Sequence, residues 1–420
     1  MGLTLTGEEE ALLGGAQGPA VQLAMRILLR MAQWQGADAF IPITSAHVDG
    51  CLYEGQGVVR FVDRLRELGA RVAVPTTLNA ISVELARWRA QGVPVAFGEP
   101  AAHIVDAYLA MGVRPSFSCA PYQLGHTPGL GEQVAWGESN AIAYVNSVLG
   151  ARTDRYGDFL DILAAVAGRV PAQGLHLDAN RRGQIVFTLT DRAAALSRHE
   201  LFYPLLGYAV GLRTPPGRVP VVLGLPDHPG PDRLKAFFAA AASGGSVALA
   251  HLVGITPEAP DLSTALHHRP PDCLSAIDRD DLDAVRARLC TARGDGVDAV
   301  VLGSPHFSVQ EFEQLARLVS GRRRRDGLDL VVTTSQFMRQ AAADQGWLDP
   351  VERFGARVIA DTCVLVSPLL HASVGTVMTN SGKYAHYIPG RLGKAVVMGS
   401  LEECVEAAVT GRMPKEAPWT

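Results

Sequence analysis

The stretches GADAFIPITSAH (residues 36–47) and GVDAVVLGSPH (residues 296–306) decide the fold class. Each contains a short apolar run that ends in small and polar residues. The same order of apolar run, polar turn and helical pattern recurs in VPVVLGLP, LDLVVTTSQF and RVIADTCVLVSP. Short apolar strands that alternate with helices predict parallel α/β sheets. Ligands bind such sheets beyond the carboxyl ends of the strands, so the residues that follow each strand are the first candidates for a site.

Further elements follow from local patterns. LTGEEEALL predicts a helix with Thr6 as its N-cap and Glu9 three residues later, and a second helix is expected from about Pro19 to Gln35. ARVAVP (residues 70–75) is expected to be a strand that leads into TTLNA. VPVAFG (residues 93–98) is expected to be a strand before the helix AAHIVDAYLAMG.

Length and composition limit the class of protein. A chain of 420 residues predicts two or three domains, and we expect α/β lobes at 1–155, 156–265 and 266–420. A net charge of −4 gives no reason to expect a nucleic-acid partner, and no apolar run approaches the ~20 residues of a membrane span. The acidic N-terminus is not a signal peptide. Six cysteines are too sparse for a disulfide framework, so we expect a reducing cytoplasm.

Two cysteines stand in matching contexts. Cys119 in SFSCAPYQLG and Cys363 in IADTCVLVSP each follow an expected strand and precede a turn that contains proline. A single cysteine is most often a buried inert residue. Two at strand ends favour a shared metal or catalytic site, although the chain has no CxxC pair of the kind that a zinc ribbon uses.

Several polar clusters also follow expected strands. His47 and Asp49 are two residues apart on an expected loop, which suits a metal ligand, an acid/base pair or a simple turn hydrogen bond. TTLNA places Thr76, Thr77 and Asn79 where a helix N-terminus can bind an anion, or where Asn79 acts only as a cap. The segment 136–159 is denser in polar residues than a structural helix requires; its candidates are Asn140, Arg152, Tyr156 and Asp158.

The segment VMTNSGKYAHYIPG (residues 377–390) is the richest in chemistry. Asn380, Ser381, Lys383 and His386 lie among glycines that allow sharp turns. A core strand would not accept so many polar groups without partners. We expect a substrate-binding loop at the mouth of the site.

Together these motifs resemble the catalytic part of aconitase X. The resemblance runs over nearly the whole chain and includes LTGEEEALLGGAQGPAVQLAMRIL, PITSAHVDGCLYEG, SCAPYQLG, GESNAIAYVNSVLGARTDRYGDFLDI and MTNSGKYAHY. It implies an aconitase-like α/β fold of several parallel-sheet lobes around a central cleft, an iron–sulfur cluster and a hydro-lyase (dehydratase) reaction on a small hydroxy-carboxylate. Two activities are known in the family, on cis-3-hydroxy-L-proline and on mevalonate 5-phosphate.

The resemblance places cluster ligands at three motifs, which correspond to Cys119, Ser304 and Cys363. Serine stands at the middle position, in GSPH, where the family pattern has cysteine. A smaller cluster, 2Fe–2S rather than 3Fe–4S or 4Fe–4S, is therefore favoured, and with it the hydroxyproline substrate. The resemblance also implies that the small swivelling domain of the family is a separate subunit, which closes the site.

The resemblance implies roles for the polar clusters. Lys383 and Arg152 are candidates for binding the substrate carboxylate, and His47, Asp49 and His386 for moving protons. The substrate-binding candidates are Ser45, Thr76, Thr77, Asn79, Asn140, Arg152, Tyr156, Asp158, Asn380 and Ser381. Two rival interpretations stay open: a divalent-metal hydrolase that uses His47, Asp49 and His306, and a non-catalytic binding or regulatory subunit.

Overall fold

The computed structural model describes residues 3–125, 127–226 and 228–414. The chain divides into two compact units, Met1–Arg182 and Gly183–Thr420, and each is described by itself. No helix within the described ranges is long and apolar enough to cross a membrane.

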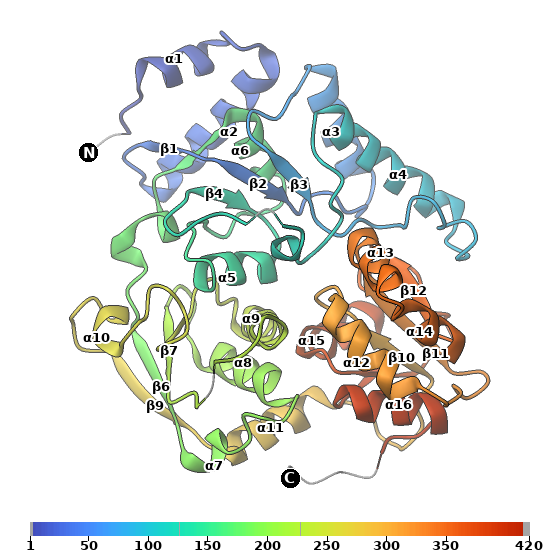
Figure 1. The fold of residues 1–420 in the computed structure, drawn as a ribbon. Helices are drawn as coiled ribbons and strands as arrows, with labels where there is room; N and C mark the ends of the chain where they lie inside the picture. The colour runs from blue at the N-terminus through green and yellow to red at the C-terminus, as the bar shows by residue number, and fades with distance from the viewer. Residues whose placement is uncertain (1–2, 126, 227, 415–420) are drawn as a thin grey trace. The chain divides into compact units, whose positions relative to one another are not determined.

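The first unit combines a parallel sheet with a helical layer (Figure 1). Its parallel sheet has the strand order β3-β2-β4, and β1 pairs antiparallel with β5. The elements are α1 (Gly7–Gly14), α2 (Pro19–Gln35), β1 (Phe40–Pro42), β2 (Ser45–Val48), α3 (Gln56–Glu67), β3 (Thr76–Leu78), α4 (Val95–Ala110), β4 (Val134–Trp136), α5 (Ser139–Ser147), α6 (Leu160–Ala167) and β5 (Arg169–Pro171), with short 3-10 turns at Pro121–Gln123, Gly174–His176 and Asp178–Asn180.

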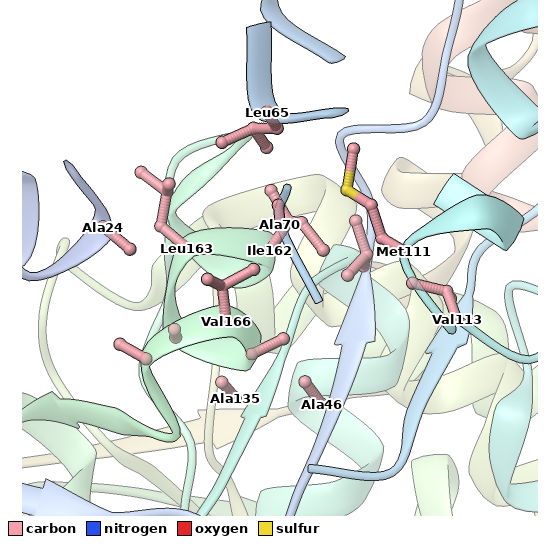
Figure 2. Packing of buried hydrophobic residues seen from close by; sticks show 14 of the residues in the cluster. Ala24, Ala46, Leu65, Ala70, Met111, Val113, Ala135, Ile162, Leu163 and Val166 are labelled. Carbon is pink, nitrogen blue, oxygen red and sulfur yellow. The ribbon is translucent and has the colours of Figure 1, made fainter. Parts of the chain in front are cut away.

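The core of the first unit forms around α6. All residues of α6 from Asp161 to Ala167 are buried, because the helix is apolar on nearly every side. Figure 2 shows Ile162, Leu163 and Val166 of α6 among Ala24 of α2 and Ala46 of β2. The expected lobe boundary at 155/156 would separate α6 from this core, and the structure places the boundary after Arg182 instead.

The second unit contains two parallel sheets, with strand orders β8-β7-β6-β9 and β12-β11-β10-β13-β14. Its elements are β6 (Ile185–Leu189), α7 (Asp191–Ala194), α8 (Phe202–Arg213), β7 (Pro220–Leu223), α9 (Pro231–Gly245), β8 (His251–Leu252), α10 (Leu262–Ala265), β9 (Cys273–Ile277), α11 (Arg279–Leu289), β10 (Ala299–Leu302), α12 (Val309–Val319), β11 (Asp329–Thr334), α13 (Gln336–Asp344), α14 (Leu348–Phe354), β12 (Arg357–Ala360), β13 (Thr376–Thr379), α15 (Gly382–Leu392), β14 (Ala395–Met398) and α16 (Leu401–Thr410).

Small residues set the packing of α8 and α9, which lie side by side in Figure 1. A Cβ atom on Gly207 of α8 would lie 2.1 Å from the carbonyl oxygen of Phe237 in α9, so only glycine allows this approach. The expected lobe boundary at 265/266 also differs from the structure, because β9 pairs with β6 and so belongs to the same sheet as β7 and β8.

The parallel α/β architecture is confirmed, and so are α1 with its Thr6–Glu9 capping box and α2. Two expected strands are wrong. Residues 70–75 do not form the expected strand; the strand of this region is β3, which begins only at Thr76. No helix starts after β3, because residues 79–93 are bends, turns and irregular structure. VPVAFG is not a strand either: α4 begins at Val95, because Pro94 fixes the backbone for a helix start.

Candidate active site

His47 is a buried strand residue rather than a loop residue. It lies in β2 with no exposed surface, and its Nδ1 is 2.8 Å from Oγ1 of Thr77 on the neighbouring strand β3. Burial lowers the pKa of His47 to about 3, and the main chain of Ser118 opposes this only partly. The imidazole is therefore neutral at physiological pH and carries one proton on one of its two nitrogens.

The carboxyl end of β2 carries a second pair. Asn79 donates from Nδ2 to Oδ1 of Asp49, whereas Nδ1 of His47 lies beside the hydroxyl of Thr77. The main-chain N–H of Asp49 donates to the buried carboxyl of Asp161 at 2.6 Å. Burial raises the pKa of Asp161 to about 6.

Three buried polar atoms on these strands lack a hydrogen-bond partner within the described part of the chain. They are Oγ of Ser45, Nε2 of His47 and Oδ1 of Asn79. Ser45 begins β2, His47 lies within it, and Asn79 follows β3. Buried polar groups are nearly always satisfied, so such orphaned atoms indicate a place for a ligand or ordered water. Thr76 differs, because its hydroxyl donates to the carbonyl of Val74 at 2.8 Å.

Cys119 follows a stretch without regular structure and is 7% exposed. Its carbonyl accepts a hydrogen bond of 2.9 Å from Nδ2 of Asn140, in the first turn of α5. The same Nδ2 lies 3.0 Å from the hydroxyl of Tyr122, whose ring stacks on Tyr144. Asn140 therefore positions the loop that carries Cys119.

The remaining candidates of the first unit already have partners. Arg152 forms an ion pair with Asp178, and the hydroxyl of Tyr156 bonds Nε2 of His176. Asp158 lies on the exposed segment before α6, where its charge helps to raise the pKa of Asp161 after the larger effect of burial.

In the second unit, the predicted residues gather at the carboxyl ends of the sheet strands. Ser304 follows β10 in a turn whose peptide bond to Pro305 is cis, and it is 8% exposed. Cys363 follows β12 and is half-buried. His306, buried in the same turn as Ser304, lies 3.2 Å through Nε2 from the carbonyl of Thr362, so the two strand ends are tied together.

Several groups around Cys363 partly offset the effect of burial on its thiol. Burial raises the pKa of its thiol, but the main-chain N–H groups of Leu365 and Val366, the charge of Lys383 and the hydroxyl of Tyr384 act in the opposite direction. These groups all stabilise a negative sulfur, and a soft thiolate is the usual protein ligand of iron–sulfur clusters.

The segment 377–390 is a strand end and a helix rather than a loop. β13 ends at Thr379, Ser381 caps α15, and its Oγ accepts from the main-chain N–H of Tyr384 at 3.1 Å. Tyr384 is fully buried, and its hydroxyl lies 2.9 Å from Oγ1 of Thr333, so this polar group has a partner inside the protein. His386, farther along α15, lies 2.8 Å through Nδ1 from the hydroxyl of Tyr208.

A cavity of about 210 Å³ lies at this end of the second unit. Four predicted residues line it together: Ser304, Asn380, Ser381 and Lys383. Asn380 donates to Glu200 at 3.1 Å, and Ser381 donates from Oγ to the carbonyl of Ser304. A small cavity with converging polar groups indicates a small-molecule site.

The same cavity contains residues that the sequence did not single out. Lys235, Asp232 and Glu311 line it as an ionic group in which Lys235 is buried and the two carboxylates are half-buried, with Arg198, Glu200 and Arg233 beside them. The capping box of Ser308 and Glu311 is visible in the sequence, but nothing in PDRLKAFF distinguishes Lys235 from a solvated helix residue. No group of three or more His, Cys, Asp and Glu side chains suited to a metal gathers within the described ranges, so the three-residue hydrolase site has no support there.

Comparison with known proteins places the chain in a family. Models of the first, second and third domains of aconitase X match residues 2–179, 183–287 and 297–410. A cis-3-hydroxy-L-proline dehydratase from Pseudomonas aeruginosa is 48% identical over 99% of this chain and 72% of its own length. A phosphomevalonate dehydratase large subunit from Methanothermobacter thermautotrophicus is 37% identical over 92% of this chain and 94% of its own length.

The fold agrees with these matches. This chain superposes on the crystal structure of Thermococcus kodakaraensis aconitase X in its holo-form with a TM-score of 0.87 and 32% sequence identity. The match covers 97% of this chain and 100% of the Thermococcus kodakaraensis chain. The domain order, the parallel sheets and the length of the matches all point to the same conclusion. The chain belongs to the aconitase X family.

Proposed function

We propose that this chain is the large catalytic subunit of a hydro-lyase that converts cis-3-hydroxy-L-proline to pyrroline-2-carboxylate. The observation that carries the proposal is the 48% identity to the Pseudomonas aeruginosa dehydratase of that substrate, over 99% of the chain. A Hypocrea jecorina enzyme of the same name is 44% identical over 100% of the chain.

Dehydration of mevalonate 5-phosphate is the second candidate. Its support is coverage: the alignment spans 94% of the Methanothermobacter thermautotrophicus large subunit but 72% of the Pseudomonas aeruginosa enzyme. Identity is lower, at 37% against 48%, and for that reason we rank this substrate second.

The reaction removes the α-proton and the neighbouring hydroxyl group, which leave together as one water molecule. Negative charge builds on the substrate carboxylate as the α-proton departs, so a nearby cation accelerates the step. Lys383 lines the cavity and is the cation that we assign to the carboxylate. Arg152, the other candidate, is already in an ion pair with Asp178.

Hydrogen bonds assign positioning roles to two other cavity residues. The hydroxyl of Ser381 donates to the carbonyl of Ser304 and accepts from the N–H of Tyr384, so it orients the Ser304 turn and the start of α15. Asn380 holds Glu200 at the cavity wall.

In the first unit, His47 takes part as a neutral imidazole. Its Nε2, with Oγ of Ser45 and Oδ1 of Asn79, offers orphaned polar atoms to a ligand. Since burial keeps the pKa of His47 at about 3, His47 hydrogen-bonds or passes a single proton rather than donating as an imidazolium.

The residues that would hold an iron–sulfur cluster are Cys119, Cys363 and Ser304. The thiolate-stabilising groups around Cys363 support this assignment. When bound, such a cluster supplies a Lewis acid for the departing hydroxyl. A 2Fe–2S cluster is the form that we favour, because serine is a harder and poorer ligand for cluster iron than cysteine.

A small swivelling-domain subunit completes the proposed enzyme. The archaeal relatives are named as large subunits, which supports a partner of this kind. We place the enzyme in the cytoplasm, a location that the six free cysteines favour.

The test supplies the cluster-loaded chain with each substrate, with and without a small swivelling-domain protein encoded nearby. Product formation is followed by NMR. We expect dehydration of cis-3-hydroxy-L-proline by the pair and almost none by the chain alone, because an unclosed site does not exclude water. Turnover of mevalonate 5-phosphate alone would establish the second candidate, and turnover of neither by the loaded pair would overturn the hydro-lyase.

A further inference from the structure

The turn at residues 303–308, between β10 and α12, is held from several elements at once. Oγ1 of Thr333 in β11 donates to the carbonyl of Gly303 at 2.7 Å, and the N–H of Phe307 donates to the carbonyl of Thr333 at 3.0 Å. From α15, Oγ of Ser381 donates to the carbonyl of Ser304. This turn therefore presents the Ser304 side chain from a fixed main chain, at the wall of the cavity.

Lys235 of α9 makes the contact on the remaining side. It is 2% exposed, and its Nζ lies 3.0 Å from Oδ1 of Asp232 and 3.2 Å from the carbonyl oxygen of His306. It also forms an ion pair with Glu311. The Lys235 ammonium has three hydrogens, and it has three acceptors: Asp232, Glu311 and the carbonyl of His306. No donor of Lys235 therefore remains for a substrate.

The two carboxylates link α9 to the start of α12. Asp232 accepts a hydrogen bond of 2.8 Å from Oγ of Ser308, the N-cap of α12, and Glu311 accepts one of 2.8 Å from the N–H of Ser308. Each carboxylate lies in the first turn of its helix, where the helix dipole favours negative charge. Lys235 then balances the charge of two half-buried carboxylates that lie close together.

We propose that Lys235 is a positioning residue, which fixes the 303–308 turn so that Ser304 and His306 keep their places at the site. A buried ion pair adds little net stability compared with apolar packing, and its value here is the geometry that it imposes. An apolar residue at position 235 would fill the space but leave the carbonyl of His306 without its donor. The assignment of the turn to the active site rests on the proposed function, whereas its fixation by Lys235 does not.

The test uses the double variant Lys235→Met/Glu311→Gln. Glutamine at position 311 keeps the capping box, and the paired change removes one charge of each sign, so that Asp232 keeps its hydrogen bond from Ser308 but loses its cation. Hydrogen exchange at the amide of Phe307, measured on the chain without cluster, should become about ten- to a hundredfold faster, because a charge-assisted hydrogen bond is lost. In the loaded enzyme, kcat should fall while the KM for cis-3-hydroxy-L-proline changes little. The variant Lys235→Arg, which keeps a cation, should retain part of the parent's kcat and part of its slow exchange at Phe307.

Val351→Ala is the matched control, because it removes a fully buried side chain of α14 from the hydrophobic core that also contains Phe307, while it leaves the hydrogen bonds and ion pairs of the turn in place. It should lower the melting temperature and leave exchange at Phe307 close to that of the parent. If the double variant does not fold, Lys235→Gln/Glu311→Gln gives the same test, since the glutamine amide ends one bond short of lysine Nζ. Unchanged Phe307 exchange in the folded variant overturns the proposal. Faster exchange in an enzyme pair that never dehydrates cis-3-hydroxy-L-proline would overturn only the proposed function.

Discussion

Replacing His47 with glutamine should make the first unit less sensitive to acid. Burial lowers the pKa of His47 from its ordinary 6.5 to about 3. The unfolded chain takes up this proton below pH 6.5 and the folded chain only near pH 3. The stabilisation is therefore complete above pH 6.5 and is lost as the pH falls toward 3. Between pH 7 and pH 5 this one residue costs ~2 kcal/mol of unfolding free energy.

Other buried groups of the same unit set the size of the effect. Burial lowers the pKa of His176 to about 3, which adds a loss of ~2 kcal/mol over the same range. Burial raises the pKa of Asp161 from 3.8 to about 6, so this carboxyl has the opposite sign and regains ~1.3 kcal/mol on acidification. The three together predict a net loss of roughly 2.5 kcal/mol from pH 7 to pH 5 in the parent and roughly 0.5 kcal/mol in His47→Gln.

Hydrogen exchange of the slowest amides in β2 and α6, corrected for intrinsic rates, reports the opening of the first unit by itself. Thr77→Val is the control, because it removes the hydroxyl 2.8 Å from Nδ1 but leaves the imidazole buried. It should lower stability at both pH values and keep the ~2 kcal/mol difference assigned to His47. If His47→Gln loses as much stability between pH 7 and pH 5 as the parent, the buried neutral imidazole is not the cause.

Three further predictions concern the chemistry. Lys383→Met should lower kcat/KM about a hundred- to a thousandfold, because a cation near the developing charge contributes ~2–4 kcal/mol, with little change in melting temperature; a few-fold effect would remove Lys383 from this role. Cys119→Ala and Cys363→Ala should each abolish the visible iron–sulfur absorption together with activity, whereas an inert buried cysteine would cost only about 1–2 kcal/mol of stability. Ser304→Cys should shift the absorption spectrum or iron content, since a softer ligand then faces the iron. If Ser304→Cys and Ser304→Ala both leave absorption, iron content and rate unchanged, Ser304 does not face the cluster.

The sequence predicted the sheets where strands are apolar and β-branched. β10, β11 and β12 are runs of valine, isoleucine and leucine that end in polar turns, and all three were expected. β3 is only Thr76–Leu78, and its polar residues look like a turn because Thr76 and Leu78 are buried by their neighbours rather than by their own pattern. VPVAFG was wrongly predicted to be a strand from its apolar pattern. Its last four residues begin α4, and Gly98 packs closely against Trp88 from within that helix.

The candidate site divides in the same way. Ser304 follows β10, a strand that the sequence predicted, whereas Asn380, Ser381 and Lys383 were singled out only by the density of polar residues in a segment that we expected to be a loop. All four line one cavity, because the carboxyl ends of parallel strands share one edge of a sheet. The hydrogen-bond partners of the candidate residues could not be predicted from the sequence. Thr77 was expected to bind an anion and instead hydrogen-bonds His47 across two parallel strands, a register that no local pattern encodes.

Lys235 shows why local patterns fail for the supporting residues of a site. In the sequence it is one of several charged residues at the start of a helix, a context typical of solvent exposure. It is buried only because α9 contacts the turn after β10, some seventy positions later in the chain. There Glu311 and the carbonyl of His306 accept hydrogen bonds from its ammonium. A lysine costs several kcal/mol to bury alone, so its place depends on acceptors that only the tertiary fold assembles. Residues that face a ligand can be found from strand ends, while residues that hold those strand ends in place require the structure.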